Sequence, residues 1–202
     1  MKTAKETVDR GWERRRREIL DGAAEVFFER GFHRGTTKEI AEKVGLTQSA
    51  IYHYVGAKDD LLAEIARQVD HDFSRALDES IASSDDPVER LRSLIGSFVD
   101  MIVLNQKTVA VYWKEQNSIP PAVYEETSAD QRRYVGRIEE VVSDVQALGV
   151  LPADRPTHVV AEGIIGMLSW LYWWYRPGVH SAAEIAASFS DLIGLPPVAG
   201  AR

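Results

Sequence analysis

Apolar residues recur along the chain with the spacing of one helix face, and Gly, Pro and capping signals separate the successive runs. The first clear run covers about residues 13–30 and ends at Gly31, which suits a left-handed helix C-cap. No alternating β-branched stretch of strand length interrupts the pattern. The sequence therefore predicts an all-α fold of about nine helices.

Two short helices and a long one follow the first run. Thr36–Glu39 has the form of a capping box, and it opens a short helix that ends at Gly45. Thr47 is placed to cap a second short helix, which ends at Gly56. A longer helix is predicted over about residues 58–82.

The second half of the chain contains five further predicted helices. The first begins at the start signal Asp86–Glu89, and the others cover about residues 106–117, 123–148, 156–175 and 182–193. These helices divide into one predicted module over residues 13–73 and a second over residues 74–202. Because the boundary falls within the long helix predicted over residues 58–82, the two modules are expected to share an element.

Composition narrows the class of protein. The 202 residues include no Cys, which excludes a disulfide scaffold, a thiolate metal site and a cysteine nucleophile. No apolar run reaches the roughly 18 residues of a membrane span, and the charged start is unlike a signal peptide. We therefore expect a cytoplasmic protein without a membrane partner.

Charge is distributed unevenly along the chain. Residues 1–58 hold 12 Lys and Arg against 9 Asp and Glu, a net of +3, within a total of −7. The remaining residues hold 12 against 22, a net of −10. A basic N-terminal part on an acidic body suggests that this part meets a polyanion.

The two short helices, over residues 36–55, form a helix-turn-helix candidate. Gly45 and Leu46 supply the tight turn, and Ile40 and Ile51 are apolar residues that can hold the helices together. The outer face of the second helix begins with short polar residues. A helix of this kind presents its first turns to base edges in the major groove of DNA.

Particular residues give this segment a family likeness. Thr36-Thr37-Lys38-Glu39-Ile40-Ala41, Val44-Gly45-Leu46-Thr47, Ile51-Tyr52-His53-Tyr54 and Lys58-Asp59-Asp60-Leu61-Leu62 together resemble the DNA-binding domain of the TetR (tetracycline repressor) family. One departure is Val55, where the family usually has Phe. The resemblance, which covers roughly residues 13–73, implies a transcription regulator that binds double-stranded operator DNA. It implies a DNA-binding domain over residues 13–73 and a ligand-binding and dimerisation domain over residues 74–202, and it leaves open whether the regulator represses or activates.

The chemistry of individual side chains supports DNA binding. Lys58 at a helix start and the hydroxyl of Tyr52 suit phosphates, and Gln48 can pair with adenine. The arginines of the run Arg14–Arg17 follow the DNA backbone, enter the adjacent minor groove, or remain in solvent. The candidate DNA contacts are Arg14, Arg15, Thr36, Thr37, Lys38, Thr47, Gln48, Ser49, Tyr52, His53, Tyr54 and Lys58.

A single short recognition helix binds weakly, which favours a two-fold dimer on successive half-sites. The last two predicted helices carry small residues between large apolar ones, and the corresponding pair in the family forms a four-helix dimer interface. The alternative is that these are core helices of a monomer. The candidate homodimer contacts are His158, Gly163, Gly166, Trp173, Ala183 and Ala187.

Five of the six residues in Trp170–Tyr175 are aromatic. On a helix Trp170, Trp173 and Trp174 share one side, and we expect part of this group to line a cavity for a small apolar or amphipathic effector. The candidate ligand-binding residues are Phe98, Met101, Ile102, Tyr112, Trp113, Gln116, Tyr134, Ile138, Met167, Trp170, Leu171 and Trp174.

A short segment points to one class of effector. The residues Trp174-Tyr175-Arg176-Pro177-Gly178 resemble a TetR subgroup associated with acyl-coenzyme A thioesters and with lipid or steroid breakdown. An acyl-coenzyme A thioester is therefore one candidate effector.

Enzyme signatures are weak. The sequence has no nucleophile elbow, P-loop or dinucleotide fingerprint, and His158 and Glu162 have no third metal ligand at a useful spacing. We therefore predict no catalytic residue, no metal and no cofactor. The alternative class is a small helical enzyme or lipid carrier that retains a helix-turn-helix-like segment.

Overall fold

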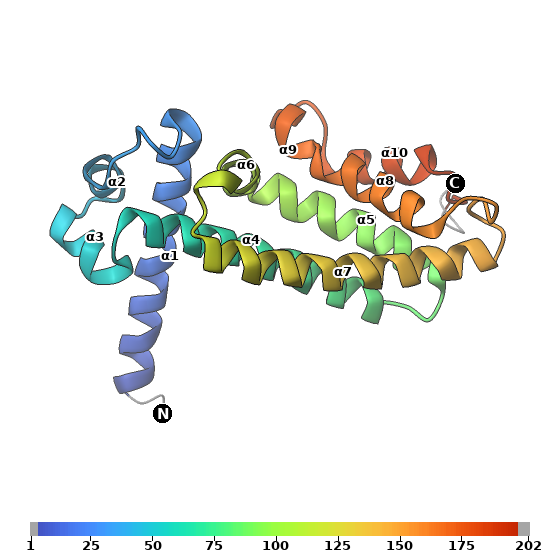
Figure 1. The fold of residues 1–202 in the computed structure, drawn as a ribbon, viewed down its shortest axis with the longest axis horizontal. Coiled ribbons are helices and arrows are strands. Elements are labelled where there is room, and N and C mark those ends of the chain that lie inside the picture. Colours follow the sequence, from blue (N-terminus) through green and yellow to red (C-terminus); the bar gives the residue numbers. More distant parts are fainter. Residues whose placement is uncertain (1–3, 198–202) are drawn as a thin grey trace. The chain divides into compact units, whose positions relative to one another are not determined.

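The computed structural model describes residues 4–197, with side chains from residue 11 onward, and these residues form helices and no strand (Figure 1). The all-α prediction is confirmed. The chain divides into two compact units. The first runs through Val69 and also includes Lys107–Thr127, and the second comprises Asp70–Gln106 and the chain from Ser128 onward.

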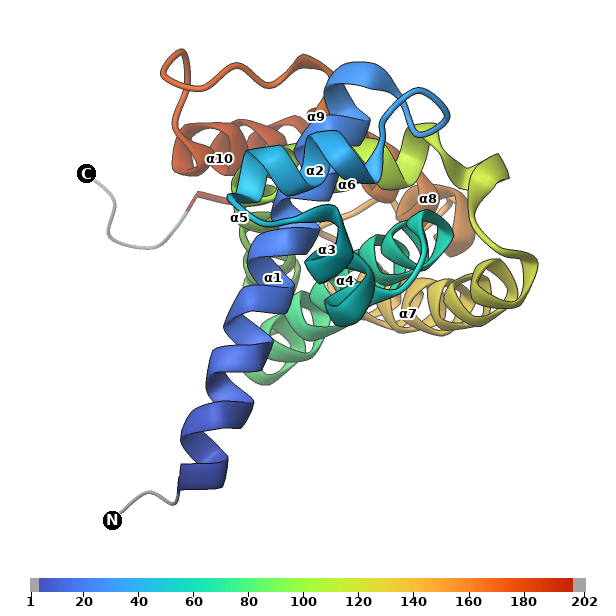
Figure 2. The same cartoon turned by 90° about the vertical axis from the view of Figure 1, so that its left-hand side faces the viewer.

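The first unit contains the helix-turn-helix. Its helices are α1 (Ala4–Arg30), α2 (Thr37–Val44), α3 (Gln48–Val55), the start of α4 (Lys58–Ala82), α6 (Gln106–Lys114), the 3-10 helix η1 (Gln116–Ser118) and the start of α7 (Pro121–Ala147). Helix α1 runs beside α2 and α3, and it begins earlier than the apolar pattern predicts (Figures 1 and 2). Its first turns lack the apolar stripe on which the prediction rested.

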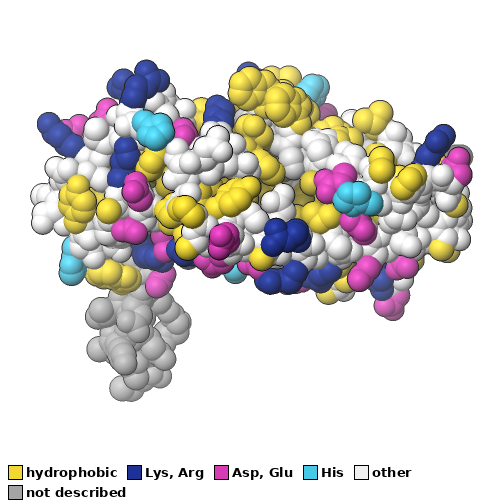
Figure 3. Space-filling model, viewed as in Figure 1, with side chains coloured by type: hydrophobic (Ala, Val, Ile, Leu, Met, Phe, Trp, Pro, Cys, Tyr) yellow, Lys and Arg dark blue, Asp and Glu magenta, His cyan; other side chains and the backbone are white. Residues whose placement is uncertain are grey.

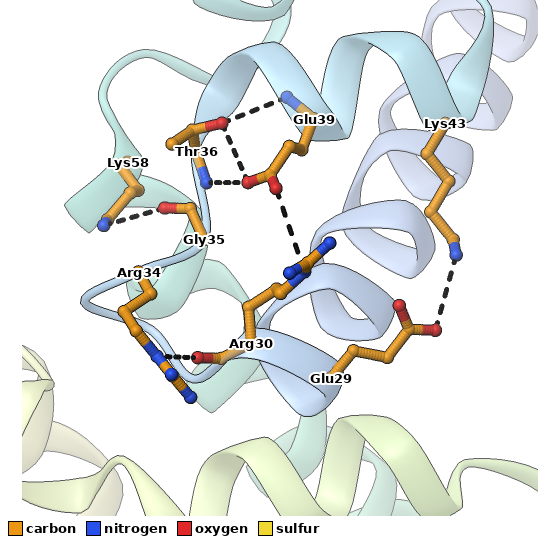
Figure 4. A network of polar contacts seen from close by, with 8 residues as sticks. All are labelled: Glu29, Arg30, Arg34, Gly35, Thr36, Glu39, Lys43 and Lys58. Atoms are coloured by element: carbon orange, nitrogen blue, oxygen red, sulfur yellow. Dashed lines mark hydrogen bonds and ion pairs between the residues drawn. The ribbon is translucent and has the colours of Figure 1, made fainter.

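The capping signals act as predicted (Figure 4). The Thr36 hydroxyl accepts a bond from the Glu39 amide at 3.2 Å, and the Glu39 carboxylate accepts one from the Thr36 amide at 2.9 Å. Gly45 ends α2 with φ of 67°, and the Thr47 hydroxyl accepts a bond from the Ala50 amide at 3.2 Å. These contacts satisfy amides that a helix end leaves unpaired.

Apolar packing fixes the helix-turn-helix on α1. Ile40 of α2 and Ile51 of α3 are fully buried, as is Ile19 of α1. Helices α1 and α2 come so close that a Cβ at Gly22 would lie 2.4 Å from the Val44 side chain. Only a glycine fits at this crossing without moving its neighbour.

The second unit holds the remaining helices. It contains the later parts of α4 and α7 together with α5 (Pro87–Leu104), α8 (Thr157–Ser169), α9 (Leu171–Trp174) and α10 (Ala182–Leu192). The carboxylate of Asp86 caps α5 by accepting a bond from the Val88 amide at 2.8 Å. Ser181 and Glu184 form a capping box at the start of α10. The start signal predicted at Asp86 is confirmed.

Two predicted helices are shorter than expected. The helix predicted over residues 156–175 is interrupted at Trp170, because the Trp173 amide bonds the Trp170 carbonyl at 3.1 Å, a tighter i to i−3 turn. The helix predicted over residues 106–117 ends at Lys114 and is followed by η1. Periodicity continues through both breaks, so it cannot reveal them.

Within the described residues, no single helix is long and apolar enough to cross a membrane. Helices α5 and α6 meet the length and composition limits only as a pair, with a sharp bend between them.

Candidate nucleic-acid interface and effector module

The outer face of α3 carries polar side chains that are linked to α2. Gln48 donates from Nε2 to the Thr37 hydroxyl at 2.8 Å, and the Thr37 and Tyr52 hydroxyl oxygens are 3.3 Å apart. Thr37 itself is buried, whereas Tyr52 is 50% exposed and Gln48 is exposed. Gln48 also has a second amide hydrogen and a carbonyl oxygen, the groups that can pair with a base edge.

The other predicted contacts on α2 and α3 differ in how free they are. Ser49 and His53 are exposed on α3. The Thr36 and Thr47 hydroxyls already serve as caps, and the Thr36 hydroxyl also donates to Glu39. Lys38 is 75% exposed and lies 3.9 Å from the Glu42 carboxylate, a surface pair that leaves the ammonium accessible.

Lys58 begins α4, as the sequence predicts, and its side chain reaches back to the loop between α1 and α2. Its ammonium donates to the carbonyls of Phe32, His33 and Gly35 at 2.7, 3.2 and 3.0 Å, and it lies 4.5 Å from the centroid of the Phe32 ring. Figure 4 shows this side chain reaching the turn that joins α1 to α2. All three ammonium donors are thereby used, so phosphate contact by Lys58 stays a prediction.

Three arginines in the first half of α1 are paired with acids. Arg15 lies 2.6 Å and Arg14 3.8 Å from the Glu18 carboxylate. Arg16 lies 2.8 Å from Glu64 of α4. Arg14 is 81% exposed, so its weak pair leaves it accessible to a phosphate.

Trp12 on α1 is a contact of α3 that sequence reasoning missed. Its ring centroid is 4.4 Å from that of Tyr54 and 5.4 Å from that of His53, and the residue is 38% exposed. Trp12 precedes the apolar run from which the first helix was predicted. A prediction that α1 begins before residue 12 would have placed Trp12 on the helix and made this contact foreseeable.

Helix α6 belongs with the helix-turn-helix, which the sequence also did not indicate. Lys107 lies 2.7 Å from Glu25 of α1, and the Glu115 carboxylate accepts a bond from the Phe32 amide at 3.0 Å. Glu25 also lies 2.6 Å from Lys43 of α2. The two lysines lower the pKa of Glu25 through their hydrogen bonds, so one carboxylate joins three helices.

The predicted effector residues fall into different environments. In the second unit Phe98, Met101, Ile102, Tyr134, Ile138 and Leu171 are buried, and Met167 is partly buried. The rings of Phe98 and Tyr134 lie 5.2 and 6.1 Å from the ring of Phe73. Tyr112, Trp113 and Gln116 belong to the first unit.

Trp173 and Trp174 of α9 and Trp170, which precedes it, face solvent. Trp170 is 55% exposed and Trp174 38%, whereas Leu171 and Tyr175 are buried, so the tryptophans share the exposed side of this segment, as predicted. Trp174 borders an open groove of about 230 Å³ along α10. The groove is lined by Trp174, His180, Glu184, Ile185, Ser188 and Phe189.

The predicted dimer contacts all lie on exposed positions of the second unit. His158, Gly163 and Gly166 are exposed on α8, Trp173 on α9, and Ala183 and Ala187 on α10. Val159 of α8 and Leu192 of α10 are 62% and 74% exposed. Figure 3 shows hydrophobic side chains gathered over α9. Exposed apolar and small residues on successive helices are typical of a protein contact surface.

His158 has a carboxylate partner within its own unit. Its Nδ1 lies 2.7 Å from Glu139 of α7, and this hydrogen bond raises the pKa of the imidazole. In the sequence, Glu162 lies four residues after His158, a spacing at which both side chains could bind one metal ion. In the structure Glu162 contributes only a weaker charge effect on the same imidazole.

Comparison with known proteins agrees with this geometry. The family model described as "Bacterial regulatory proteins, tetR family" matches residues 19–65, and "Tetracyclin repressor-like, C-terminal domain" matches residues 84–194. The chain is 28% identical over 177 residues to the HTH-type transcriptional repressor KstR2 of Rhodococcus jostii (strain RHA1), covering 86% of this chain and 85% of that protein.

Solved structures share the fold. The TetR family transcriptional regulator PfmR from Thermus thermophilus has a TM-score of 0.80 at 25% identity, with 87% of this chain and 96% of that chain covered. AibR, solved in complex with isovaleryl coenzyme A and operator DNA, has a TM-score of 0.77 at 25% identity, with 91% and 100% covered.

The fold and the polar face of α3 define a helix-turn-helix regulator of transcription. The two family matches together extend from the first unit through almost all of the second. The chain belongs to the TetR family of bacterial regulatory proteins.

Proposed function

We propose that this chain is a homodimeric repressor that binds a palindromic operator in the cytoplasm and is released by a small effector. The exposed polar face of α3, already braced through Gln48, Thr37 and Tyr52, carries the DNA-binding part of the proposal. Two such faces in a two-fold dimer would read half-sites about 34–36 Å apart. The protein has no catalytic role in this proposal.

The effector is proposed to be apolar or amphipathic, with an acyl-coenzyme A thioester as the leading candidate. Support comes from the likeness to AibR, which was solved with isovaleryl coenzyme A. The aromatic and aliphatic side chains around Phe98, Ile102 and Tyr134 suit an acyl chain. The exposed face of α8 and α10 is the proposed dimer contact.

Release requires that the effector bind one conformation of the protein better than the other. If the effector binds the released conformation about 10⁴-fold more tightly than the operator-binding conformation, a difference of about 5.5 kcal/mol, almost all of the protein moves to the form that does not fit the operator. The same coupling requires operator DNA to weaken effector binding by an equal factor.

The first test is selection of duplexes from a random library by the purified protein. The enriched sequence should be a palindrome, and affinity for it should fall by roughly 10³-fold or more between about 50 and 200 mM salt. Enrichment of no sequence, or an affinity that salt leaves unchanged, would contradict the DNA-binding proposal.

The second test addresses the effector and uses the duplex selected in the first test. Isovaleryl coenzyme A and longer acyl thioesters should raise the dissociation constant for this duplex, measured by fluorescence anisotropy. Free coenzyme A is the matched control, because it lacks the acyl chain and should have little effect. If every thioester leaves affinity unchanged, the effector class is wrong while the DNA-binding proposal stands.

A further inference from the structure

Trp12 makes two ring contacts with the last turns of α3. Its indole is tilted by 38° against the Tyr54 ring at 4.4 Å, and it meets the His53 ring edge-on, at 86° and 5.4 Å. His53 and Tyr54 are themselves 5.8 Å apart at 70°, so the three rings form one cluster. All three residues belong to the first unit.

Helix α3 needs such external support. It has eight residues, of which only Ile51 and Val55 are buried. Helices this short are not stable alone, so packing must hold them. Ile51 and Val55 anchor one side, which leaves exposed side chains such as His53 to rotate unless a neighbour restrains them. Trp12 and Tyr54 are the rings that meet His53 among the described aromatic contacts.

The restraint matters because of where His53 lies. It is exposed on the same helix as Gln48 and Tyr52, and each imidazole nitrogen is a donor or an acceptor for a base edge. A ring held in one orientation loses less entropy on binding than a freely rotating ring, and it also favours one base over others.

We propose that Trp12 is a positioning residue for DNA recognition, which holds His53 in the orientation that α3 presents to base edges. This inference rests on the proposed function. It also extends the recognition apparatus into a part of α1 that precedes residue 19, where the family match begins.

The test compares base preferences selected from one random duplex library. The variants are Trp12→Phe, Trp12→Leu, His53→Ala and the double variant Trp12→Leu/His53→Ala. His53→Ala should lose preference at one position of each half-site. Trp12→Leu should lose discrimination at that same position by roughly 3- to 10-fold, as the loss of an aromatic pair predicts, and Trp12→Phe should retain most of it. The double variant should lose no more there than His53→Ala.

Phe28→Ala is the matched control. Phe28 lies on the same helix and is 37% exposed, close to the 38% of Trp12, but its ring contact is with Lys114 of α6. This variant should leave base preferences unchanged. A uniform loss of affinity for all sequences in Trp12→Leu, or additive effects in the double variant, would overturn the inference.

A second readout needs no DNA. In the free protein, the His53 ring-proton resonances should move on Trp12→Leu, because the indole ring current is removed. If these resonances do not move, Trp12 does not contact His53 in solution and the inference is overturned. If the wild-type protein enriches no sequence, the proposed function fails, which is distinct from wild-type enrichment with an unchanged preference in Trp12→Leu.

Discussion

At the scale of single residues, Lys58 shows how one side chain holds a turn together. The carbonyls of Phe32, His33 and Gly35 all accept from its ammonium, and Phe32 and Gly35 are buried. Carbonyls in a turn lack the amide donors that a helix supplies, and the Lys58 ammonium takes the place of those donors. Such a residue contributes to folding whether or not it also meets a phosphate.

Lys58→Ala should therefore lower the free energy of unfolding by about 1–3 kcal/mol, because it leaves hydrogen-bond acceptors without partners. Urea denaturation followed by circular dichroism measures the loss. Lys38→Ala is the control, since Lys38 is exposed and should change stability by less than about 0.5 kcal/mol. Unchanged stability in Lys58→Ala together with lost DNA binding would instead favour the phosphate contact predicted from the sequence.

At the scale of helices, Glu25 joins α1 to both α2 and α6. Lys107 and Lys43 lower its pKa below the ordinary value, so the carboxylate stays charged in the folded state to a lower pH than in the unfolded state. The stabilisation is therefore present above the unfolded pKa and is lost as pH falls through the folded pKa. The three side chains are about one-third to one-half exposed, so solvent weakens the effect.

Glu25→Gln should lower the free energy of unfolding at pH 7 by about 0.5–1 kcal/mol. The difference from wild type should shrink as pH falls below 4.5 and vanish once Glu25 is protonated in the folded protein. Thermal unfolding at several pH values gives this profile. Glu29→Gln, which removes a longer contact of 3.7 Å to Lys43, should change less. An equal deficit at acid and neutral pH would contradict the assignment.

The sequence predicts local helix ends well because each is decided by a few neighbouring residues. The capping boxes at Thr36 and Ser181 and the left-handed Gly45 were all predictable in this way. The contacts of Lys58 and the attachment of α6 through Lys107 were not, because they join residues far apart in the chain. The family pattern indicates which α3 residues face outward, but it does not reveal that Trp12 supports them.

At the scale of the whole molecule, the proposed dimer depends on the exposed face of α8 and α10. A Cβ at Gly163 or Gly166 would meet no atom within 4 Å in its own protomer. Small residues of this kind allow two helices to approach closely, as a dimer contact would require. The chain's own packing therefore gives no reason for glycine at these positions, whereas a partner helix would.

Gly166→Glu should separate folding from association. The new side chain points into open space within the protomer, and glutamate is a better helix former than glycine, so helical content should be kept. In the dimer the charge would be buried without a partner, at a cost of about 3–5 kcal/mol, which weakens association by roughly 100-fold or more. Analytical ultracentrifugation should then show monomers, and affinity for the palindromic duplex should fall because each half-site is bound singly.

Gly136→Glu on α7 is the matched control, since that glycine is also exposed with no atom near its Cβ position, and the variant should remain a dimer. A dimer that survives Gly166→Glu but not Gly136→Glu would place the contact on α7 instead of α8.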